Sequence, residues 1–341
     1  MSRSLGVGFL GAGLVTQAIH LPVLAEVPDQ FHVVSVMDID AGVAERVAAR
    51  CGATFTTDTD AILHDPNVDV IVVCSPHAMH AAQVVAACDA NKLAVLCEKP
   101  LALSRIEVEQ ISAAAAASGT NVMVGAMHVY DPAYRAAHRA WVEQDDEAVF
   151  TQSSIFLPSN DFFTVLASEP ASPPPPPPSG EGLSDAAMLR EAVLGLVIHN
   201  LPLLRQFHPR LGELASARFI RPFGYAIVVG DEDQTLELLG YMGGMWPPHW
   251  ALRTVGRSCE LRVMFTPSFV LAGSSRAELV TADSTQVFEF DTNGYQCEWA
   301  ALYEAAVGEA EPLVSLGDVV DDIICALELA ERVERLVGKT S

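Results

Sequence analysis

Leu93-Ala94-Val95-Leu96-Cys97-Glu98-Lys99-Pro100 is an apolar run that ends in a charged pair and a proline. Continuous apolar residues are typical of strands that are buried on both faces of a parallel sheet. The chain contains only three lysines, Lys92, Lys99 and Lys339, so a lysine directly after a buried strand is informative. Open α/β sheets bind ligands at the carboxyl ends of their strands. The run therefore predicts that Lys99 points into a ligand-binding cleft; the alternative is a solvated strand end with an incidental Glu–Lys pair.

The first 125 residues alternate short apolar runs with amphipathic, alanine-rich stretches. Besides Leu93–Cys97, the apolar runs are Leu5–Leu10, His32–Met37, Asp69–Cys74 and Asn121–Gly125. Helical patterns lie between them, near residues 15–26, 41–51, 78–90 and 104–118. Such alternation predicts an α/β domain with a doubly wound parallel sheet and helices on both faces.

After residue 126 the pattern changes to runs of strands beside a few helices. Helices are expected at Ala133–Val142, from about Asp185 to Phe207, and at residues 316–336; strands are expected at Ala148–Phe156 and at residues 215–221, 234–242, 249–256, 259–265, 276–281 and 286–290. This order predicts an α+β domain with an antiparallel sheet. The chain is therefore expected to form a first domain of residues 1–125 and a second domain of residues 126–341.

A loop at about residues 168–184 contains six consecutive prolines, Pro173–Pro178. Proline has no amide hydrogen, so the run cannot form a helix or a central strand and is expected to adopt a stiff polyproline II conformation. A spacer or lid segment within the loop is the favoured interpretation, and a ligand for a partner's aromatic groove is the alternative.

Composition restricts the class of protein. A chain of 341 residues, half of them apolar, can build a core in each of two domains. The net charge of −23 argues against nucleic acid and anionic membranes as partners, because lysine and arginine supply most phosphate contacts. Seven cysteines without CxxC spacing favour a reducing cytoplasm over a disulfide framework, and we expect no metal site. No signal peptide precedes the first strand, and no apolar run reaches the length of a membrane span.

The first predicted strand ends in a glycine-rich segment, Gly6-Val7-Gly8-Phe9-Leu10-Gly11-Ala12-Gly13. Two registers fit the fingerprint of a dinucleotide-binding turn. Gly6-x-Gly8-x-x-Gly11 buries its glycines within the strand, whereas Gly11-x-Gly13-x-x-Thr16 places them at the strand-to-helix turn. There Gly11 permits the tight turn and Gly13 lets a pyrophosphate approach the backbone at a helix N-terminus. Thr16 in place of glycine or alanine indicates slightly looser packing of the helix on the strand.

The second predicted strand ends in Asp38. A carboxylate there can accept hydrogen bonds from both ribose hydroxyls of an adenosine and repels a 2′-phosphate. Asp40 follows and no Arg or Lys stands beside it, which predicts NAD rather than NADP. The alternative is that Asp38 is a loop acid or the cap of the helix at residues 40–51. Leu14 and Val15, just beyond the glycine turn, complete the expected cofactor contacts in this region.

Together these features resemble the Gfo/Idh/MocA family of nicotinamide-dependent oxidoreductases, which includes glucose-fructose oxidoreductase and inositol dehydrogenases. The matching residues are Gly11-Ala12-Gly13, Asp38, Ser75-Pro76-His77-Ala78-Met79-His80, Cys97-Glu98-Lys99-Pro100-Leu101-Ala102, Asp131-Pro132-Ala133-Tyr134 and His199. The resemblance covers the first 135 residues and the helix around His199, and the C-terminal strands only by pattern. It implies a Rossmann domain followed by a domain with a large open sheet, through which a homodimer or homotetramer is expected to form.

The resemblance also implies roles for individual residues. Lys99 is expected to bond the reacting hydroxyl and the network beside the nicotinamide. Glu98 helps to shape the cofactor site, and Ser75, Pro76 and His80 belong to the loop near the cofactor. The substrate is expected to be a sugar, cyclitol or related polyol, oxidised or reduced at a carbinol carbon.

The chain departs from the family pattern around His199. The family has an Asp four residues before this His and a second acid three residues after it, where this chain has Gly195 and Pro202. Pro202 cannot donate to the carbonyl of Ile198 and is expected to kink the helix. Gly195 indicates either close approach of nicotinamide or substrate, or tight helix–strand packing. A lone histidine on an apolar helix is usually a core residue, but the family position favours a site role for His199.

Other polar groups can replace the missing acid. Tyr130 and His128 rank first as auxiliary catalytic residues, because they follow the fifth predicted strand; Glu191 and Asp185 are further candidates on the apolar helix.

The expected reaction is NAD-dependent hydride transfer at a substrate hydroxyl bound between Lys99 and His199. One of these two side chains takes the hydroxyl proton, and the charge of Lys99 stabilises the developing alkoxide. Two other classes remain open. One is a non-catalytic NAD-binding regulator, and the other is an enzyme that uses transient oxidation of a sugar for elimination or hydrolysis.

Overall fold

The computed structural model describes residues 3–158, 183–243 and 247–338, so Pro173–Pro178 and nearly all of the loop at 168–184 lie outside the described residues. The chain divides into two compact units. Among the described residues, the first unit holds 3–125 together with Glu298–Ile323, and the second holds 126–158, 183–243, 247–297 and 324–338. The expected domain limits, 1–125 and 126–341, stay a prediction.

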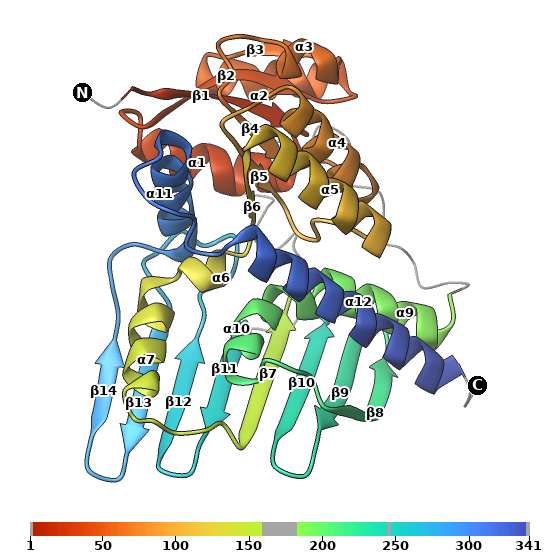
Figure 1. Cartoon of the computed structure of the whole chain (residues 1–341), viewed down its shortest axis with the longest axis vertical. Coiled ribbons are helices and arrows are strands. Elements are labelled where there is room, and N and C mark those ends of the chain that lie inside the picture. The colour runs from red at the N-terminus through yellow and green to blue at the C-terminus, as the bar shows by residue number, and fades with distance from the viewer. Residues whose placement is uncertain (1–2, 159–182, 244–246, 339–341) are drawn as a thin grey trace. The chain divides into compact units, whose positions relative to one another are not determined.

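The first unit contains a six-stranded parallel sheet (Figure 1). Its strands are β1 (Leu5–Leu10), β2 (Phe31–Met37), β3 (Thr54–Thr56), β4 (Val70–Val73), β5 (Ala94–Cys97) and β6 (Asn121–Val124). They are ordered β3-β2-β1-β4-β5-β6, so the order reverses between β1 and β4 as in a doubly wound sheet. The predicted parallel sheet is confirmed. The edge strand β3 was not predicted, because a run of three residues carries no usable periodicity.

Helices connect these strands. They are η1 (Thr16–His20, π-helical), α1 (Leu21–Glu26), α2 (Ala41–Cys51), α3 (Thr59–Leu63), α4 (His77–Asp89) and α5 (Arg105–Ser118). Side chains cap three of the starts: the Asp40 carboxylate accepts from the amides of Gly42 and Val43 at α2, the Asp58 carboxylate from the amide of Asp60 at α3, and the Ser104 hydroxyl from the amide of Glu107 at α5. Such caps satisfy amides that have no partner within the helix.

A helix that was not predicted, α11 (Gly294–Val307), contributes to the core of the first unit. Trp299, 0% exposed, stands edge-on to Phe31 at a ring distance of 5.0 Å, and the Tyr303 hydroxyl donates to the carbonyl of Arg3 at 3.1 Å. The apolar residues of α11 are spread around the helix rather than gathered on one face, so its sequence shows little helical periodicity. The predicted closing helix is confirmed as α12 (Leu316–Gly338).

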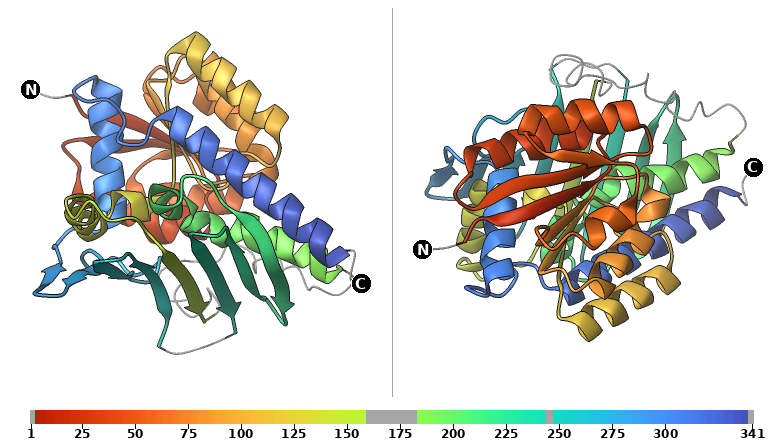
Figure 2. Two further views of the ribbon diagram at one scale, coloured as in Figure 1. Left: turned by 60° about the horizontal axis from the view of Figure 1, so that its bottom comes forward. Right: turned by 90° about the horizontal axis from the view of Figure 1, so that it is seen from above.

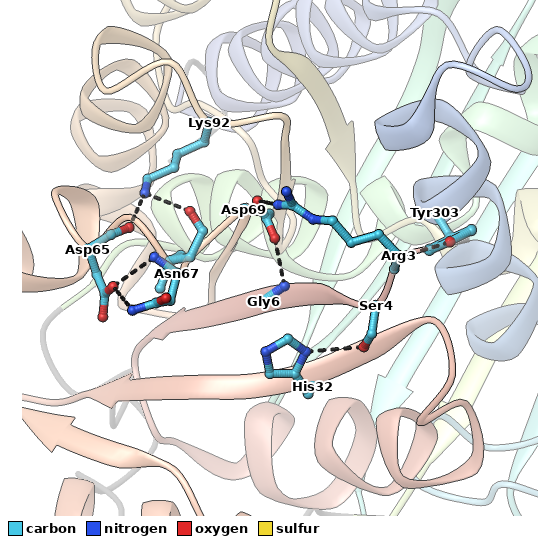
Figure 3. A network of polar contacts seen from close by, with 10 residues as sticks. Arg3, Ser4, Gly6, His32, Asp65, Asn67, Asp69, Lys92 and Tyr303 are labelled. Atoms are coloured by element: carbon cyan, nitrogen blue, oxygen red, sulfur yellow. Dashed lines mark hydrogen bonds and ion pairs between the residues drawn. The ribbon is translucent and has the colours of Figure 1, made fainter. Parts of the chain in front are cut away.

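Polar contacts join the amino ends of the strands in the first unit (Figure 3). Lys92 is 8% exposed, and its Nζ donates to the carbonyl oxygens of Asp65 and Val68 at 3.0 and 2.7 Å. The Asp69 carboxylate accepts from the amide of Gly6 at 2.9 Å and pairs with Arg3. Lys92 precedes β5 and therefore has a structural role at the end of that strand opposite to Lys99.

The second unit contains an eight-stranded, mostly antiparallel sheet, as predicted. Its strands are β7 (Phe150–Leu157), β8 (Glu213–Ile220), β9 (Gly224–Gly230), β10 (Thr235–Met242), β11 (His249–Val255), β12 (Cys259–Met264), β13 (Arg276–Thr281) and β14 (Thr285–Phe288). The order is β14-β13-β12-β11-β7-β10-β9-β8, with one parallel pair, β7 and β10. β9 was not predicted. Alternate residues of β9 to β13 are buried, which leaves one face of the sheet partly exposed.

Helices cover the other face of this sheet (Figure 2, left). They are α6 (Met127–Tyr130), α7 (Pro132–Val142), α9 (Asp185–Gly195), the 3₁₀ turn η2 (Val197–His199) and α10 (Leu201–Phe207). The expectation of one helix from Asp185 to Phe207 is therefore wrong, although the kink expected beside His199 is confirmed. The bend is 71°, and Pro202 stands in the first turn of α10, where its missing amide hydrogen costs nothing.

Among the described residues, no single helix is both long enough and apolar enough to cross a membrane. The α9–α10 pair reaches that length and composition only as two bent segments taken together.

Candidate functional site

The carboxyl ends of four neighbouring strands carry the predicted cofactor residues. The glycine turn follows β1, Asp38 follows β2, Ser75 and Pro76 follow β4, and Glu98-Lys99 follows β5. These strands are adjacent in the order β2-β1-β4-β5. The structure therefore brings the residues to one edge of the first unit, the edge at which open α/β sheets bind ligands.

The turn after β1 requires glycine at position 11. Gly11 has a φ of +105°, and a Cβ there would lie 2.6 Å from the carbonyl oxygen of Cys74. At Gly13, by contrast, a Cβ would meet no described atom within 4 Å, so the backbone is open to a ligand. Thr16 is buried and its hydroxyl donates to the carbonyl of Gly11 at 2.7 Å, which explains how a threonine fits at the third position.

The alternative register places glycines inside the strand. A Cβ at Gly6 would collide with the carbonyl of Asn67, and one at Gly8 would lie 2.5 Å from the Ile62 side chain. These glycines serve close packing within the sheet. The strand-to-helix turn therefore belongs to Gly11-x-Gly13-x-x-Thr16.

Asp38 contacts the glycine turn directly. Its Oδ2 accepts from the amide of Ala12 at 2.9 Å, and its Oδ1 accepts from the amide of Asp40 at 3.0 Å. The cap of α2 is Asp40 rather than Asp38. The capping alternative for Asp38 is thus removed, and the carboxylate stands between the end of β2 and the turn after β1.

This arrangement fits a bound dinucleotide. Helical residues begin at Leu14, so the amides of the first turn have no partner within the helix and can donate to a pyrophosphate that approaches over Gly13. Asp38 lies where an adenosine ribose is expected to bind. Gly11, Gly13, Leu14, Val15 and Asp38 would hold such a cofactor.

Glu98 is held by residues that are distant in sequence. His20 is 0% exposed, and its Nε2 lies 3.2 Å from Glu98 Oε1, while Trp299 Nε1 donates to His20 Nδ1 at 3.2 Å. Burial alone raises the pKa of Glu98, but the hydrogen bond from His20 and nearby cationic groups bring it below its ordinary value. A Cβ at Gly125 would lie 3.1 Å from the same carboxylate. Glu98 is therefore an ionised side chain in a fixed position.

Lys99 is half-buried beside this carboxylate. Burial lowers the pKa of Lys99 from its ordinary value, and the charge of Glu98 opposes that shift. A lysine with a lowered pKa can bind a hydroxyl oxygen as a cation and also take up or release a proton. Lys99 therefore has the chemistry expected of an acid, a base or an oxyanion-stabilising group.

The second unit contains a buried polar cluster around Asn200, which sequence reasoning missed. Asn200 is 0% exposed; its Nδ2 donates to Ser153 Oγ at 2.8 Å, and its Oδ1 accepts from Trp250 Nε1 at 2.9 Å and lies 3.2 Å from His128 Nδ1. An amide oxygen accepts, so His128 donates from Nδ1 and keeps a lone pair on Nε2. Burial lowers the pKa of His128 to about 3, with the Asn200 contact opposing. His128 is therefore a neutral imidazole of fixed tautomer.

The other candidate residues of the second unit are His199 and Tyr130, together with the glycine at the position of the missing acid. His199, at the end of η2, is edge-on to the Trp250 ring at 5.1 Å, and Tyr130 is 1% exposed in α6. A Cβ at Gly195 would meet no described atom within 4 Å, so tight packing on the sheet does not explain this glycine. Lys99 belongs to the first unit and His199 to the second, so their pairing stays a prediction.

Three acidic residues of the second unit, Asp131, Asp185 and Glu191, are candidate replacements for the missing acid. Asp131 caps α7 and also accepts from the amide and hydroxyl of Ser275 at 2.8 and 2.6 Å. Asp185 pairs with Arg221 at 2.6 Å, and Glu191 is exposed. None of these contacts marks a replacement for the acid missing at Gly195.

We expect Asn200→Leu to lower the free energy of unfolding of the protein by about 2–4 kcal/mol, because it leaves buried partners of the amide unsatisfied. Ser153→Ala, which removes only one hydroxyl at the edge of the cluster, is expected to cost about 1 kcal/mol. Urea unfolding followed by tryptophan fluorescence measures both. Equal losses in the two variants would show that Asn200 is not the centre of the cluster.

Comparisons with known proteins agree with this geometry. Residues 5–126 match the sequence model of an oxidoreductase family with an NAD-binding Rossmann fold, Gfo/Idh/MocA. Inositol 2-dehydrogenase of Acidothermus cellulolyticus is 40% identical over 134 residues, which are 39% of this chain and 39% of that protein. Inositol 2-dehydrogenase 3 of Saccharopolyspora erythraea is 38% identical over 130 residues, 38% of each chain. The matches thus span about two fifths of these relatives.

Solved structures extend the likeness of fold to nearly the whole chain. A 3-ketoreductase from Actinomadura kijaniata, in complex with NADP and TDP-benzene, superposes with a TM-score of 0.73 at 20% identity, covering 94% of this chain and 95% of that one. A putative myo-inositol dehydrogenase from Sinorhizobium meliloti gives a TM-score of 0.72 at 18% identity, covering 97% and 98%. At these identities the likeness shows the fold alone.

Proposed function

We propose that this chain is a nicotinamide-dependent dehydrogenase or reductase, because residues 5–126 match the model of the Gfo/Idh/MocA oxidoreductase family with its NAD-binding Rossmann fold. Its substrate is a sugar, cyclitol or related polyol, oxidised or reduced at a CH–OH carbon. The observation that carries the proposal is the position of Lys99. A half-buried lysine with a lowered pKa stands at the same sheet edge as the open glycine turn and Asp38.

The chain's own residues would prepare a hydroxyl for hydride loss. A bound nicotinamide supplies the hydride acceptor or donor. Lys99 donates a hydrogen bond to the substrate oxygen and stabilises negative charge that develops there. Glu98, fixed by His20, keeps Lys99 in place by its charge. Lys99 or His199 takes the hydroxyl proton, with Tyr130 and His128 as auxiliary candidates.

The preferred cofactor in this proposal is NAD. Asp38 stands at the glycine turn and the next residue, Ile39, is 90% exposed and carries no charge. Repulsion of a 2′-phosphate by the Asp38 carboxylate is therefore not offset by a neighbouring arginine. NADP, which one of the structural neighbours binds, is the less favoured cofactor.

The proposed partner, besides a small-molecule substrate, is a second copy of the chain. The partly exposed face of the eight-stranded sheet has a hollow lined by charged and apolar side chains, including Arg253, Arg262, Met264 and Glu278. Both signs of charge and apolar surface on one face suit a homodimer or homotetramer contact. The cytoplasmic location and the absence of nucleic-acid and membrane partners stay predictions.

Fluorescence titration with NADH and with NADPH is the first test. Micromolar NADH binding with much weaker NADPH binding would support the assignment of Gly11, Gly13 and Asp38. A panel of polyols and aldoses, including inositols, then tests turnover with NAD⁺. Steady NADH formation supports the dehydrogenase, whereas product formation without net NADH would indicate transient oxidation. Failure to bind either dinucleotide would overturn the proposal before any substrate is tried.

A further inference from the structure

The buried His80 ring contacts two backbone carbonyl oxygens. It lies in the first turns of α4 and is 1% exposed. Its Nδ1 is 2.8 Å from the carbonyl oxygen of Pro100, and its Nε2 is 2.8 Å from the carbonyl oxygen of Ser75. Carbonyl oxygens only accept hydrogen bonds, so both ring nitrogens must donate. A neutral imidazole has a single N–H, and the arrangement therefore requires a ring with a hydrogen on each nitrogen.

We propose that His80 is a positioning residue: as an imidazolium, it clamps the segment after β4 to the segment after β5 and so holds Lys99 in place. Pro100 is covalently attached to Lys99, and Ser75 begins the loop that follows β4. Both nitrogens are used by the backbone, so the ring acts on the site through these two segments. The inference rests on the proposed function for its effect on turnover, but not for the state of the ring.

The surroundings of His80 both support and oppose its charge. Glu98 supplies the compensating negative charge. Burial raises the pKa of the Glu98 carboxyl, but the contact with His20 lowers it, and the charge of His80 lowers it by a smaller amount. Lys99 is a like charge nearby, and the exposed ring of His77 stands 5.6 Å from the His80 ring. Two carbonyl acceptors and one carboxylate thus hold a buried cation that would otherwise be expelled.

The position of His80 on its helix makes this charge costly. The first turns of a helix carry the positive end of the helix dipole, where cations are disfavoured. An uncharged residue would avoid that cost if His80 served only to fill space. A histidine that is charged at this position lowers stability, yet it joins the two segments that follow β4 and β5. We infer that it is kept because Lys99 must be placed exactly.

The state of the ring can be read directly. The full chain is labelled with ¹⁵N-histidine, and the His80 nitrogens are assigned by NMR through their contacts with Ser75 and Pro100. At about pH 7 we expect both His80 nitrogens to carry hydrogen; the exposed ring of His64, whose Nδ1 lies 3.0 Å from the carbonyl oxygen of Asp60, serves as the reference spectrum. A bare nitrogen on His80 at that pH would overturn the clamp, whether or not the protein oxidises any substrate.

The effect on the site is read from His80→Gln, with His64→Gln as the matched control. Glutamine keeps one donor group and cannot reach both carbonyls. We expect kcat to fall by roughly 10- to 100-fold, the value of KM for the substrate to stay within a few-fold, and the pH profile of kcat to change, because Lys99 loses its fixed position. His64→Gln should match the wild type. If His80→Gln only lowered the melting temperature and kept kcat and its pH profile, the positioning role would be wrong. Should the variant not fold, the NMR result on the wild type still decides the state of the ring.

Discussion

Replacing Lys99 with methionine is expected to lower kcat by roughly 10²- to 10⁴-fold, the usual contribution of a positioned acid–base group, while NADH affinity stays within a few-fold of the wild type. Methionine keeps the length and apolar stem of lysine but can neither bond a hydroxyl oxygen nor stabilise an alkoxide. Asp38 and the glycine turn, which lie on other strands, would be unchanged. The measurement is steady-state turnover of the best polyol substrate beside a fluorescence titration with NADH.

A matched control is available in the chain's other described lysine. Lys92→Met removes a buried ammonium of the same unit, but one that bonds two carbonyls at the opposite end of β5. Its loss should lower the melting temperature, since two carbonyl acceptors lose their donor, and should leave kcat of the folded protein near the wild type. Turnover of Lys99→Met within a factor of a few of the wild type would remove Lys99 from the mechanism.

The pH dependence separates the two possible proton acceptors. Burial lowers the pKa of Lys99, so if Lys99 is the base, kcat/KM rises with pH through an apparent pKa below the ordinary lysine value of about 10.4. If His199 is the base, the rise is instead lost in the His199→Asn variant. A His199→Asn profile that keeps the alkaline rise would assign the proton transfer to Lys99.

The edge that carries the predicted cofactor residues could be predicted because each part of it follows from a local rule. A buried parallel strand is a continuous apolar run, and the turn after it needs a residue that can adopt positive φ, as Gly11 does at +105°. Asp38 and Lys99 lie at the same edge because every parallel strand delivers its next residues there; their roles toward a cofactor stay predictions. The parallel, doubly wound arrangement followed from the alternation of strands and helices, but the strand order was read only from the structure.

Contacts between distant segments could not be predicted in this way. His20 lies 78 residues from Glu98 and 279 residues from Trp299, and nothing in its local sequence marks these partners. Asn200 was missed for the same reason, since its contacts Ser153, His128 and Trp250 come from three other elements. Pairing in three dimensions decides these roles, and a single sequence carries no signal for it.

The second unit shows where periodicity is a sufficient guide and where it fails. Alternating burial in β10 to β13 matches alternation in sequence, so these strands were found. The parallel pairing of β7 with β10 was not, because register and partner depend on the whole sheet. Pro202 indicated a kink, but not that the chain would form a 3₁₀ turn there.

Exchanging Asp38 for serine and Ile39 for arginine is expected to reverse the cofactor preference, lowering the ratio of the NADPH to the NADH dissociation constant by roughly 100-fold or more. Removal of the carboxylate abolishes repulsion of a 2′-phosphate, and an arginine at the exposed position 39 can form charge-assisted hydrogen bonds with it. One such bond contributes about 1.5–3 kcal/mol, and every 1.4 kcal/mol is about a tenfold change in affinity. Paired titrations with NADH and NADPH measure the ratio.

The neighbouring acid provides the control for this prediction. Asp40→Ser removes the same charge one residue beyond the exchanged pair and keeps a side chain that can cap α2, so its NADPH to NADH ratio should match the wild type. The single variant Asp38→Ser also loses an acceptor for the amide of Ala12. Its melting temperature is therefore compared with that of the wild type, so that weaker binding of both cofactors is not mistaken for an altered preference. If Asp40→Ser shifted the ratio as far as Asp38→Ser, overall charge rather than contact with the ribose would set the preference. If neither variant shifted it, Asp38 would not face the ribose, and its carboxylate would serve only to tie β2 to the turn after β1.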